Sequence, residues 1–197
     1  MSAGIVRALI IGAAFGGLLC QAAAQEVPQG RVSPDAAPVS PPAHEDSPIA
    51  VGPDWRYEKQ GTAVHMFVCE QARCVPSSRV SFRFYPPNTE VTFEQFRRQQ
   101  ETIVKTLEGQ APPGTHIAIV EVTSDEGSGA KRMFTSRRLM AFPNGMKEYV
   151  SSSILFGSNH SATLVSSSSD EGASRANHGI FVHAVMPLIN GSPESKP

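Results

Sequence analysis

Four strand-like segments follow one another with only short turns between them, and this arrangement limits the fold more than any other feature of the sequence. They are "THIAIVEVTS", "AKRMFTSRRLMAF", "MKEYVSSSILF" and "HSATLVSSSS", within residues 115–169. β-Branched residues are frequent in the first of them, and the turns contain Gly, Pro, Asn and Asp. Connections this short join antiparallel strands. The sequence therefore predicts an antiparallel meander, in which "THIAIVEVTS", apolar on both faces, is a central strand.

Three further strand candidates precede the meander. "WRYEKQ" and "TAVHMFVC" flank Gly61 as the two arms of a hairpin. "RVSFRFY" alternates, with Val80, Phe82 and Phe84 on one face and polar residues between them. A period of two means that one face is buried and the other contacts water. We expect a sheet of about six strands.

Two amphipathic helices are also predicted. The first begins at Thr92, whose spacing from Gln95 fits a capping box, and it ends near Gly109. Its apolar stripe consists of Phe93, Phe96, Ile103, Val104 and Leu107. The second helix has Asp170 as its N-cap, and its apolar face consists of Ala173, Ala176, Ile180, Phe181, Ala184 and Val185. The predicted class is α+β, an antiparallel sheet with two helices packed against it.

This order of elements resembles the Mog1/PsbP-like α/β/α sandwich. The resemblance is carried by "VSFRFYPP", by the helix from Thr92 and by "SATLVSSSSDE", which leads into the last helix. It covers about two thirds of the chain, and it includes neither the cysteines nor the proline-rich segment near the N-terminus. Members of that family are mostly small accessory or binding domains, so the resemblance implies such a role.

The first residues, "MSAGIVRALIIGAAFGGLLCQAAAQ", have the pattern of a secretory signal peptide. A positive charge at Arg7 precedes an apolar stretch, and small residues follow up to Ala24. We expect cleavage after Ala24, a periplasmic or secreted location, and no transmembrane segment in the mature chain. An uncleaved anchor is the alternative, but the uncharged stretch at residues 8–25 is short for a span and is diluted by Gly and Gln.

Cleavage would leave two cysteines, Cys69 and Cys74, in the motif "CEQARC". An even number of cysteines in an exported protein indicates a disulfide. A zinc site would need about four nitrogen or sulfur ligands, and the sequence has no second pair. A redox pair would have C-x-x-C spacing near a helix start. We therefore predict a Cys69–Cys74 disulfide that staples a turn, and no metal site.

The chain is predicted to have four parts: a signal peptide at 1–24, a flexible proline-rich spacer at 25–53, a single α+β domain at 54–189 and a disordered tail at 190–197. The spacer has seven prolines in 29 residues and few large apolar side chains. Such a segment cannot bury enough surface to offset the entropy of ordering it. The sequence leaves open whether it is a tether or a tail without a task.

No motif of catalysis or cofactor binding occurs in the sequence. The serine clusters have no G-x-S-x-G, the histidines have no H-x-x-x-H spacing, and "GSGAKR" is too short for a phosphate loop. The formal charge is −1, and loss of Arg7 with the leader makes it −2, which does not support nucleic-acid binding. We expect no enzyme activity, no cofactor and no nucleic-acid partner. The serines are interpreted as coating the solvent side of the sheet and allowing tight packing elsewhere.

Basic residues recur on neighbouring elements, and Arg83, Arg137 and Arg138 are the candidate binding residues. If Arg83 and Arg137 share a sheet face, they form a shallow site for an anion or a partner. The alternative is that these are ordinary solvated positions that pair with nearby carboxylates.

The preferred interpretation is an exported, non-enzymatic accessory or binding domain that holds a protein partner or a small ligand on a sheet face or an edge strand. Two alternatives remain. One is a secreted hydrolase that uses Ser158, His160 and Asp170, which would have to lie within about 6 Å of one another. The other is a surface or effector protein that acts on a host cell.

Overall fold

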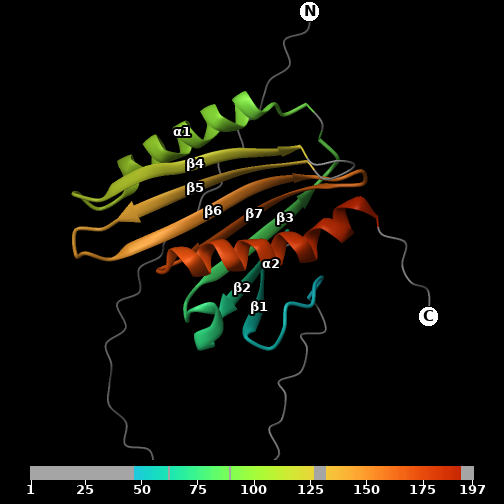
Figure 1. Cartoon of the computed structure of the whole chain (residues 1–197), viewed down its shortest axis with the longest axis horizontal. Helices are drawn as coiled ribbons and strands as arrows, with labels where there is room; N and C mark the ends of the chain where they lie inside the picture. The colour runs from blue at the N-terminus through green and yellow to red at the C-terminus, as the bar shows by residue number, and fades with distance from the viewer. Residues whose placement is uncertain (1–46, 62, 89, 127–131, 192–197) are drawn as a thin grey trace, which may run out of the picture. The chain divides into compact units, whose positions relative to one another are not determined.

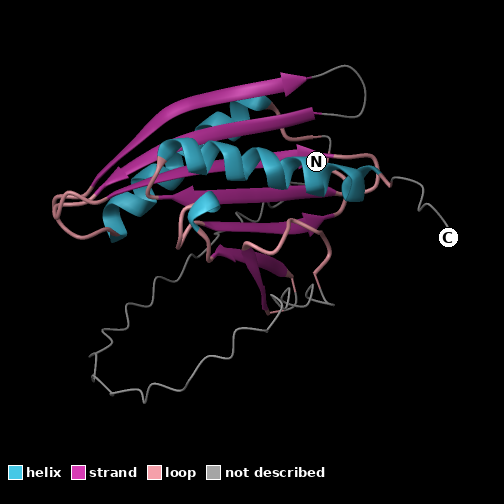
Figure 2. Ribbon diagram, turned by 60° about the horizontal axis from the view of Figure 1, so that its bottom comes forward, coloured by secondary structure: helices cyan, strands magenta, loops and turns pink. Residues whose placement is uncertain are grey.

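Seven strands form one antiparallel sheet, and two helices pack against its opposite faces (Figures 1 and 2). The computed structural model describes residues 47–61, 63–88, 90–126 and 132–191. The predicted leader, most of the spacer and most of the tail lie outside these residues. The α+β class is as predicted, with one strand more than the expected six. The elements are β1 (Trp55–Gln60), β2 (Val64–Cys69), a 3₁₀ turn (Ala72–Cys74), β3 (Arg79–Tyr85), α1 (Phe93–Gln110), β4 (His116–Glu126), β5 (Arg132–Ala141), β6 (Lys147–Phe156), β7 (Ser161–Ser168) and α2 (Glu171–Asn190).

The predicted meander from β4 to β7 is present, but it runs inward from an edge. The spatial order is β1-β2-β3-β7-β6-β5-β4, so the serine-rich strand β7 is central and β4 is an edge strand. The prediction that "THIAIVEVTS" is central was wrong. Its apolar residues are explained by α1, which packs on β4, and by a bulge between Ile119 and Glu121, where Val120 is 55% exposed.

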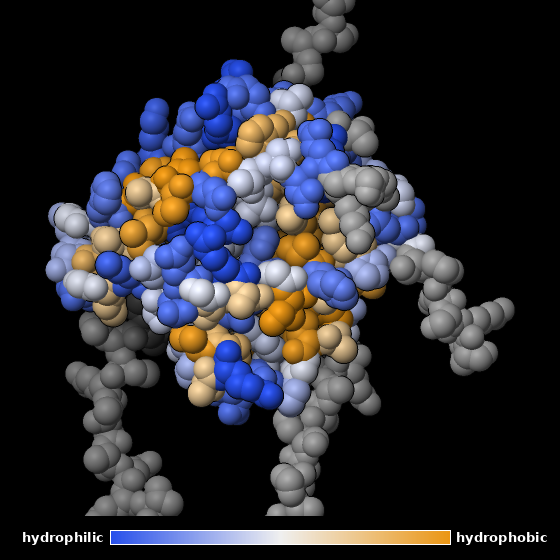
Figure 3. All heavy atoms as spheres, in the orientation of Figure 1, coloured by the Kyte–Doolittle hydropathy of each residue, from blue (hydrophilic) through white to orange (hydrophobic). Residues whose placement is uncertain are grey.

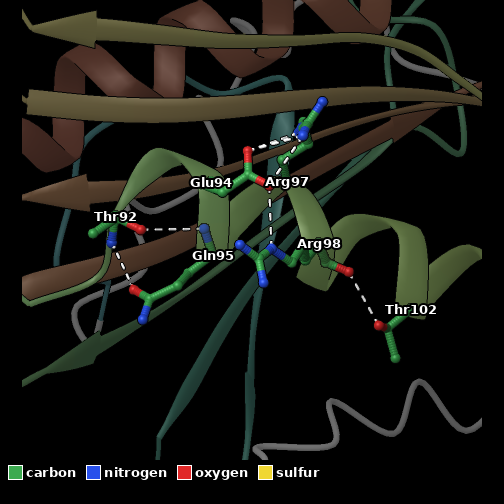
Figure 4. A network of polar contacts seen from close by, with 6 residues as sticks. All are labelled: Thr92, Glu94, Gln95, Arg97, Arg98 and Thr102. Carbon is green, nitrogen blue, oxygen red and sulfur yellow. Dashed lines mark hydrogen bonds and ion pairs between the residues drawn. The ribbon is translucent and has the colours of Figure 1, made fainter.

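Helix α1 begins with the predicted capping box (Figure 4). The Gln95 backbone N–H donates to Thr92 Oγ1 at 3.2 Å, and the Thr92 N–H donates to Gln95 Oε1 at 2.8 Å. Phe96 is buried against Phe134 of β5, with 5.8 Å between the ring centroids. The outward side is charged, since Glu94 accepts hydrogen bonds from the arginines at 97 and 98. Helix α1 therefore covers the sheet with one face and contacts water with the other.

Helix α2 crosses β7, β6 and β3 on the opposite face of the sheet and covers the main apolar core. Phe181 meets the rings of Trp55 and Phe67 edge-on, at centroid distances of 4.9 and 5.0 Å. Ile49, which the sequence analysis assigned to the spacer, is also buried in this core. In the described part of the chain, neither helix is long and apolar enough to cross a membrane.

Both ends of α2 have hydrogen-bonding partners for their terminal backbone groups. Asp170 caps the N-terminus by accepting from the Ala173 N–H at 2.7 Å, as predicted. At the other end, the backbone N–H groups at 159 and 160 both donate to the carbonyl of Ile189. Gly157 permits this approach, because a Cβ atom there would lie 2.4 Å from the Ile189 oxygen. The hairpin between β6 and β7 thus supplies donors to the helix C-terminus.

The buried stripe of α2 is rotated from the predicted one. Phe181 and Val185 are buried as expected, but Ile180 is 51% exposed and Ala176 is exposed. The remaining buried positions include Ser174, Asn177, His178 and Ile189. The hydrophobic pattern failed here because polar side chains of the helix meet a polar part of the sheet.

The predicted disulfide between Cys69 and Cys74 closes the turn between β2 and β3, with the two Cα atoms 5.8 Å apart. Val75 and Ser77 in this turn have φ values of 61° and 71°, which non-glycine residues rarely adopt. The turn is also held from outside, because the buried Asn177 of α2 donates through Nδ2 to the Cys74 carbonyl at 3.1 Å. The disulfide therefore holds the Cys74 carbonyl where it accepts a hydrogen bond from α2.

Replacing both cysteines by alanine is expected to lower the free energy of unfolding by about 2 kcal/mol, since the closed loop is only six residues long. Urea unfolding followed by circular dichroism measures the change. Wild-type protein treated with a thiol reductant is the control and should lose the same amount. An equal midpoint for the oxidised, reduced and double-alanine proteins would contradict the expectation.

Candidate functional site

The three candidate arginines lie on two different faces of the sheet. The strand register places Arg83 and Arg138 on the face that α1 covers in part, and Arg137 on the face of α2. The condition that Arg83 and Arg137 share a face is therefore not met. Adjacent residues of a strand point to opposite sides, so Arg137 and Arg138 cannot act together at one surface.

Arg137 lies beside a small hollow at the N-terminal half of α2. It forms an ion pair with Glu121 of β4, and across the hollow Arg175 pairs with Glu171 at 2.8 Å. The hollow has an empty volume of about 220 Å³ and is open to solvent. In Figure 3 the area around this half of α2 is hydrophilic, with apolar areas on either side.

Beneath the hollow, α2 meets the sheet through hydroxyl groups instead of apolar side chains. Ser151 of β6 lies 3.3 Å from Ser174 of α2, oxygen to oxygen. Ser153 lies 2.8 Å from His178 Nε2 and 2.7 Å from the hydroxyl of Thr135. These serines are buried, and they are the members of the alternating serine clusters that allow tight packing, as expected, while Ser152 and Ser167 on the other face are only half-buried. These small side chains let α2 approach the sheet closely, and their hydroxyl groups serve as hydrogen-bonding partners for one another.

The pair of Ser153 and His178 has the spacing of a nucleophile and a base, but its surroundings are those of a core. The two residues are 2% and 6% exposed, and the serine hydroxyl is shared with Thr135. Burial, together with the positive charge of Arg137, lowers the pKa of His178 to about 4. The imidazole is therefore neutral at physiological pH.

The hydrolase site postulated from the sequence is not assembled. Asp170 caps the N-terminus of α2, whereas Ser158 donates to the carbonyl of Asn190, the last residue of that helix. His160 lies at the same C-terminal end, with its backbone N–H on the Ile189 carbonyl. The helix has 20 residues and is therefore about 30 Å long, far beyond hydrogen-bonding reach. Among the described residues, no three metal-ligating side chains come together.

The largest feature that sequence reasoning missed is a part of the sheet that neither helix covers. Helix α1 packs on β4 and β5, so the same face of β2, β3 and β7 has no helix against it within the described residues. We call this surface the uncovered face. Its residues are half-buried or exposed, whereas residues of the same strands on the α2 side, such as Phe67, Phe82 and Leu164, are buried. The uncovered face consists of Val64, Met66, Val68, Arg79, Ser81, Arg83, Thr163, Val165 and Ser167.

The uncovered face combines a small apolar centre with basic margins. Val165 and Met66 lie in one row across the strands, on either side of Ser81. Arg79 and Arg83 lie on β3 on the two sides of this row, and the Arg83 guanidinium lies over the ring of Tyr85, 5.1 Å from its centroid. An apolar centre with arginines is the usual composition of a protein interface. The sequence signal for this face was the segment "VHMFV" in β2, which has large side chains at every position and therefore places them on both faces of the sheet.

Arg138 lies at the border between α1 and the uncovered face. Its Nη1 donates to Gln100 Oε1 of α1 at 2.7 Å, and burial lowers the pKa of its guanidinium. It is only 8% exposed. Arg138 is thus not an ordinary solvated position, in contrast to Arg79, which is exposed on the same side of the sheet.

Comparisons with known proteins show no family and a weak resemblance of topology. No family model matches the sequence, and no curated protein matches it. Among solved structures, the chain is similar to the solution structure of cyanobacterial PsbP (CyanoP) from Synechocystis sp. PCC 6803, with a TM-score of 0.46 and 9% sequence identity. The match covers 66% of this chain and 78% of that one. It is a weak resemblance at the level of topology to the PsbP/Mog1 fold, the fold proposed from the sequence.

The low pKa of His178 predicts a loss of stability in mild acid. Below about pH 6.5 the unfolded chain binds a proton that the folded chain binds only near pH 4. The free energy of unfolding should therefore fall by up to about 3 kcal/mol between these values because of this residue. Urea unfolding at pH 7, 5.5 and 4.5 measures the fall.

The variant His178→Gln should flatten this dependence, and the exposed His183→Gln is the matched control, which should keep it. Since carboxylates titrate in the lower part of the range, the quantity to compare is the difference between each variant and the wild type. The same pH dependence in all three proteins would show that His178 does not cause the loss.

Proposed function

We propose that this protein is an exported accessory domain, without catalytic activity, that holds a protein partner on the uncovered face. The observation that carries the proposal is that the residues of β2, β3 and β7 on this face are not buried, although their neighbours on the other face form the core. Antiparallel sheets can have one face in water, but a solvated face is usually polar. Here the central row contains Met66 and Val165.

A protein partner fits the described surfaces better than a small ligand does. The hollow beside α2 is open to solvent, and Arg137 and Arg175 at its rim are already paired with carboxylates. The uncovered face, in contrast, extends over three strands and presents Arg79 and Arg83 beside an apolar centre. A surface of this kind binds by shape and area, as protein interfaces do.

Export is supported by the sequence of residues 1–24 and by the cysteine chemistry. The described cysteines form a disulfide, which persists in oxidising compartments and is rare in the cytosol. Intact mass measurement of native material is expected to give a chain that lacks residues 1–24 and has no free thiol. A full-length chain with both thiols free would contradict the export proposal.

The partner is tested by comparing variants in a capture experiment from the periplasmic fraction. The double variant Met66→Lys/Arg79→Glu alters the centre and the margin of the uncovered face and should lose the captured protein, because it buries a new charge and reverses another. The matched control is Gln99→Lys/Lys105→Glu on the exposed side of α1, which should capture as the wild type does. Circular dichroism establishes that both variants fold. Equal capture by the two variants would place the interface elsewhere.

A further inference from the structure

Beside the uncovered face lie three buried polar groups that have no hydrogen-bonding partner among the described residues. They are the hydroxyls of Ser136 and Ser152 and the Nε–H of Arg138. Ser136 is completely buried, and Arg138 is 8% exposed. Buried polar groups in folded proteins nearly always have a partner, and leaving one without a partner is destabilising. Three such groups in one place make this patch a candidate for a bound ligand.

The sheet register brings the three groups to one patch. Ser136 of β5 and Ser152 of β6 are direct cross-strand partners, so their Cβ atoms lie about 5 Å apart. Arg138 is two residues further along β5 and therefore points to the same face as Ser136. Gln100 of α1 covers the patch from one side, where it accepts from Arg138. On the other side, Ser152 lies next to Val165 of the uncovered face.

The chemistry of the patch is that of an anion site. The guanidinium is a cation whose described partner, the Gln100 amide oxygen, is neutral. None of the ion pairs within the described residues includes Arg138. A buried charge without a counter-charge is strongly unfavourable. The Nε–H and the two hydroxyls can all donate, so the matching ligand accepts three hydrogen bonds and carries one negative charge.

We propose that Arg138, Ser136 and Ser152 form a binding site for a carboxylate or a monovalent anion of similar size. A carboxylate oxygen or a chloride ion in this patch would neutralise the guanidinium and accept from both hydroxyls. The ligand is either a free anion or a carboxylate of the partner on the uncovered face. Only the second source rests on the proposed function.

The test measures the melting temperature of the purified protein as a function of sodium acetate and of sodium chloride. In the wild type, both salts should raise it along a saturable curve. Replacing Ser136 and Ser152 by alanine removes two donors without adding bulk, and each lost hydrogen bond to a charged ligand should weaken anion affinity about tenfold. Arg138→Gln should abolish the saturable response.

The matched control is Ser151→Ala, because this buried serine of β6 points to the α2 side and contacts Ser174. Its response to both anions should equal that of the wild type. If acetate and chloride change the wild type and the double alanine variant equally, or change neither, the proposed site does not exist. The alanine variants need only fold for this comparison, which their melting curves show directly.

The source of the anion is decided by the capture experiment with the Ser136→Ala/Ser152→Ala variant. Loss of the captured partner together with the anion response indicates that the partner supplies the carboxylate. Retained capture with loss of the anion response indicates a free anion. If the wild type captures no partner but responds to acetate, the proposed function fails and the anion site stands.

Discussion

The packing of α2 across β3, β7 and β6 is the interaction on which the rest of the structure depends. At its C-terminal half, Phe181, Val185 and Ile189 are completely buried against the apolar part of the sheet. At its N-terminal half the same contact is made by hydroxyls and by His178. The disulfide turn supports this half from the side, through the bond from Asn177 to the Cys74 carbonyl. The apolar half supplies most of the stabilisation, since hydroxyl pairs contribute little net free energy.

The two helices cover different parts of the sheet, and this difference leaves the uncovered face of β2, β3 and β7 without a helix among the described residues. Helix α2 lies over the middle strands, whereas α1 follows β4 and β5 near the edge. Within the described residues, the side of the sheet opposite α2 is therefore covered by a helix at one end only. Arg138 and Ser152 lie where that cover ends, next to the uncovered face. The proposed anion site and the uncovered face are in this sense one consequence of where α1 packs.

Much of the fold could be predicted from local patterns, and the candidate site mostly could not. The strand segments, the capping box of Thr92 and Gln95 and the pairing of the cysteines each depend on residues close in the sequence. The site depends on strand order. Arg83 and Arg138 share a face only because β7 and β6 lie between β3 and β5 with a particular register. The buried face of α2 was predicted with the wrong rotation, because hydrophobic periodicity cannot identify a helix that packs on serines.

The sequence by itself determined the class of the fold, the extent of its strands, the start of α1 and the two thiols that pair. Only the tertiary structure decided that β4 is an edge, that β7 is central, and which serines are buried. The reason is that the contacts between β3 and β7 and between α2 and the sheet join residues far apart in the chain. Their geometry follows from how whole elements pack, which no short stretch of sequence encodes.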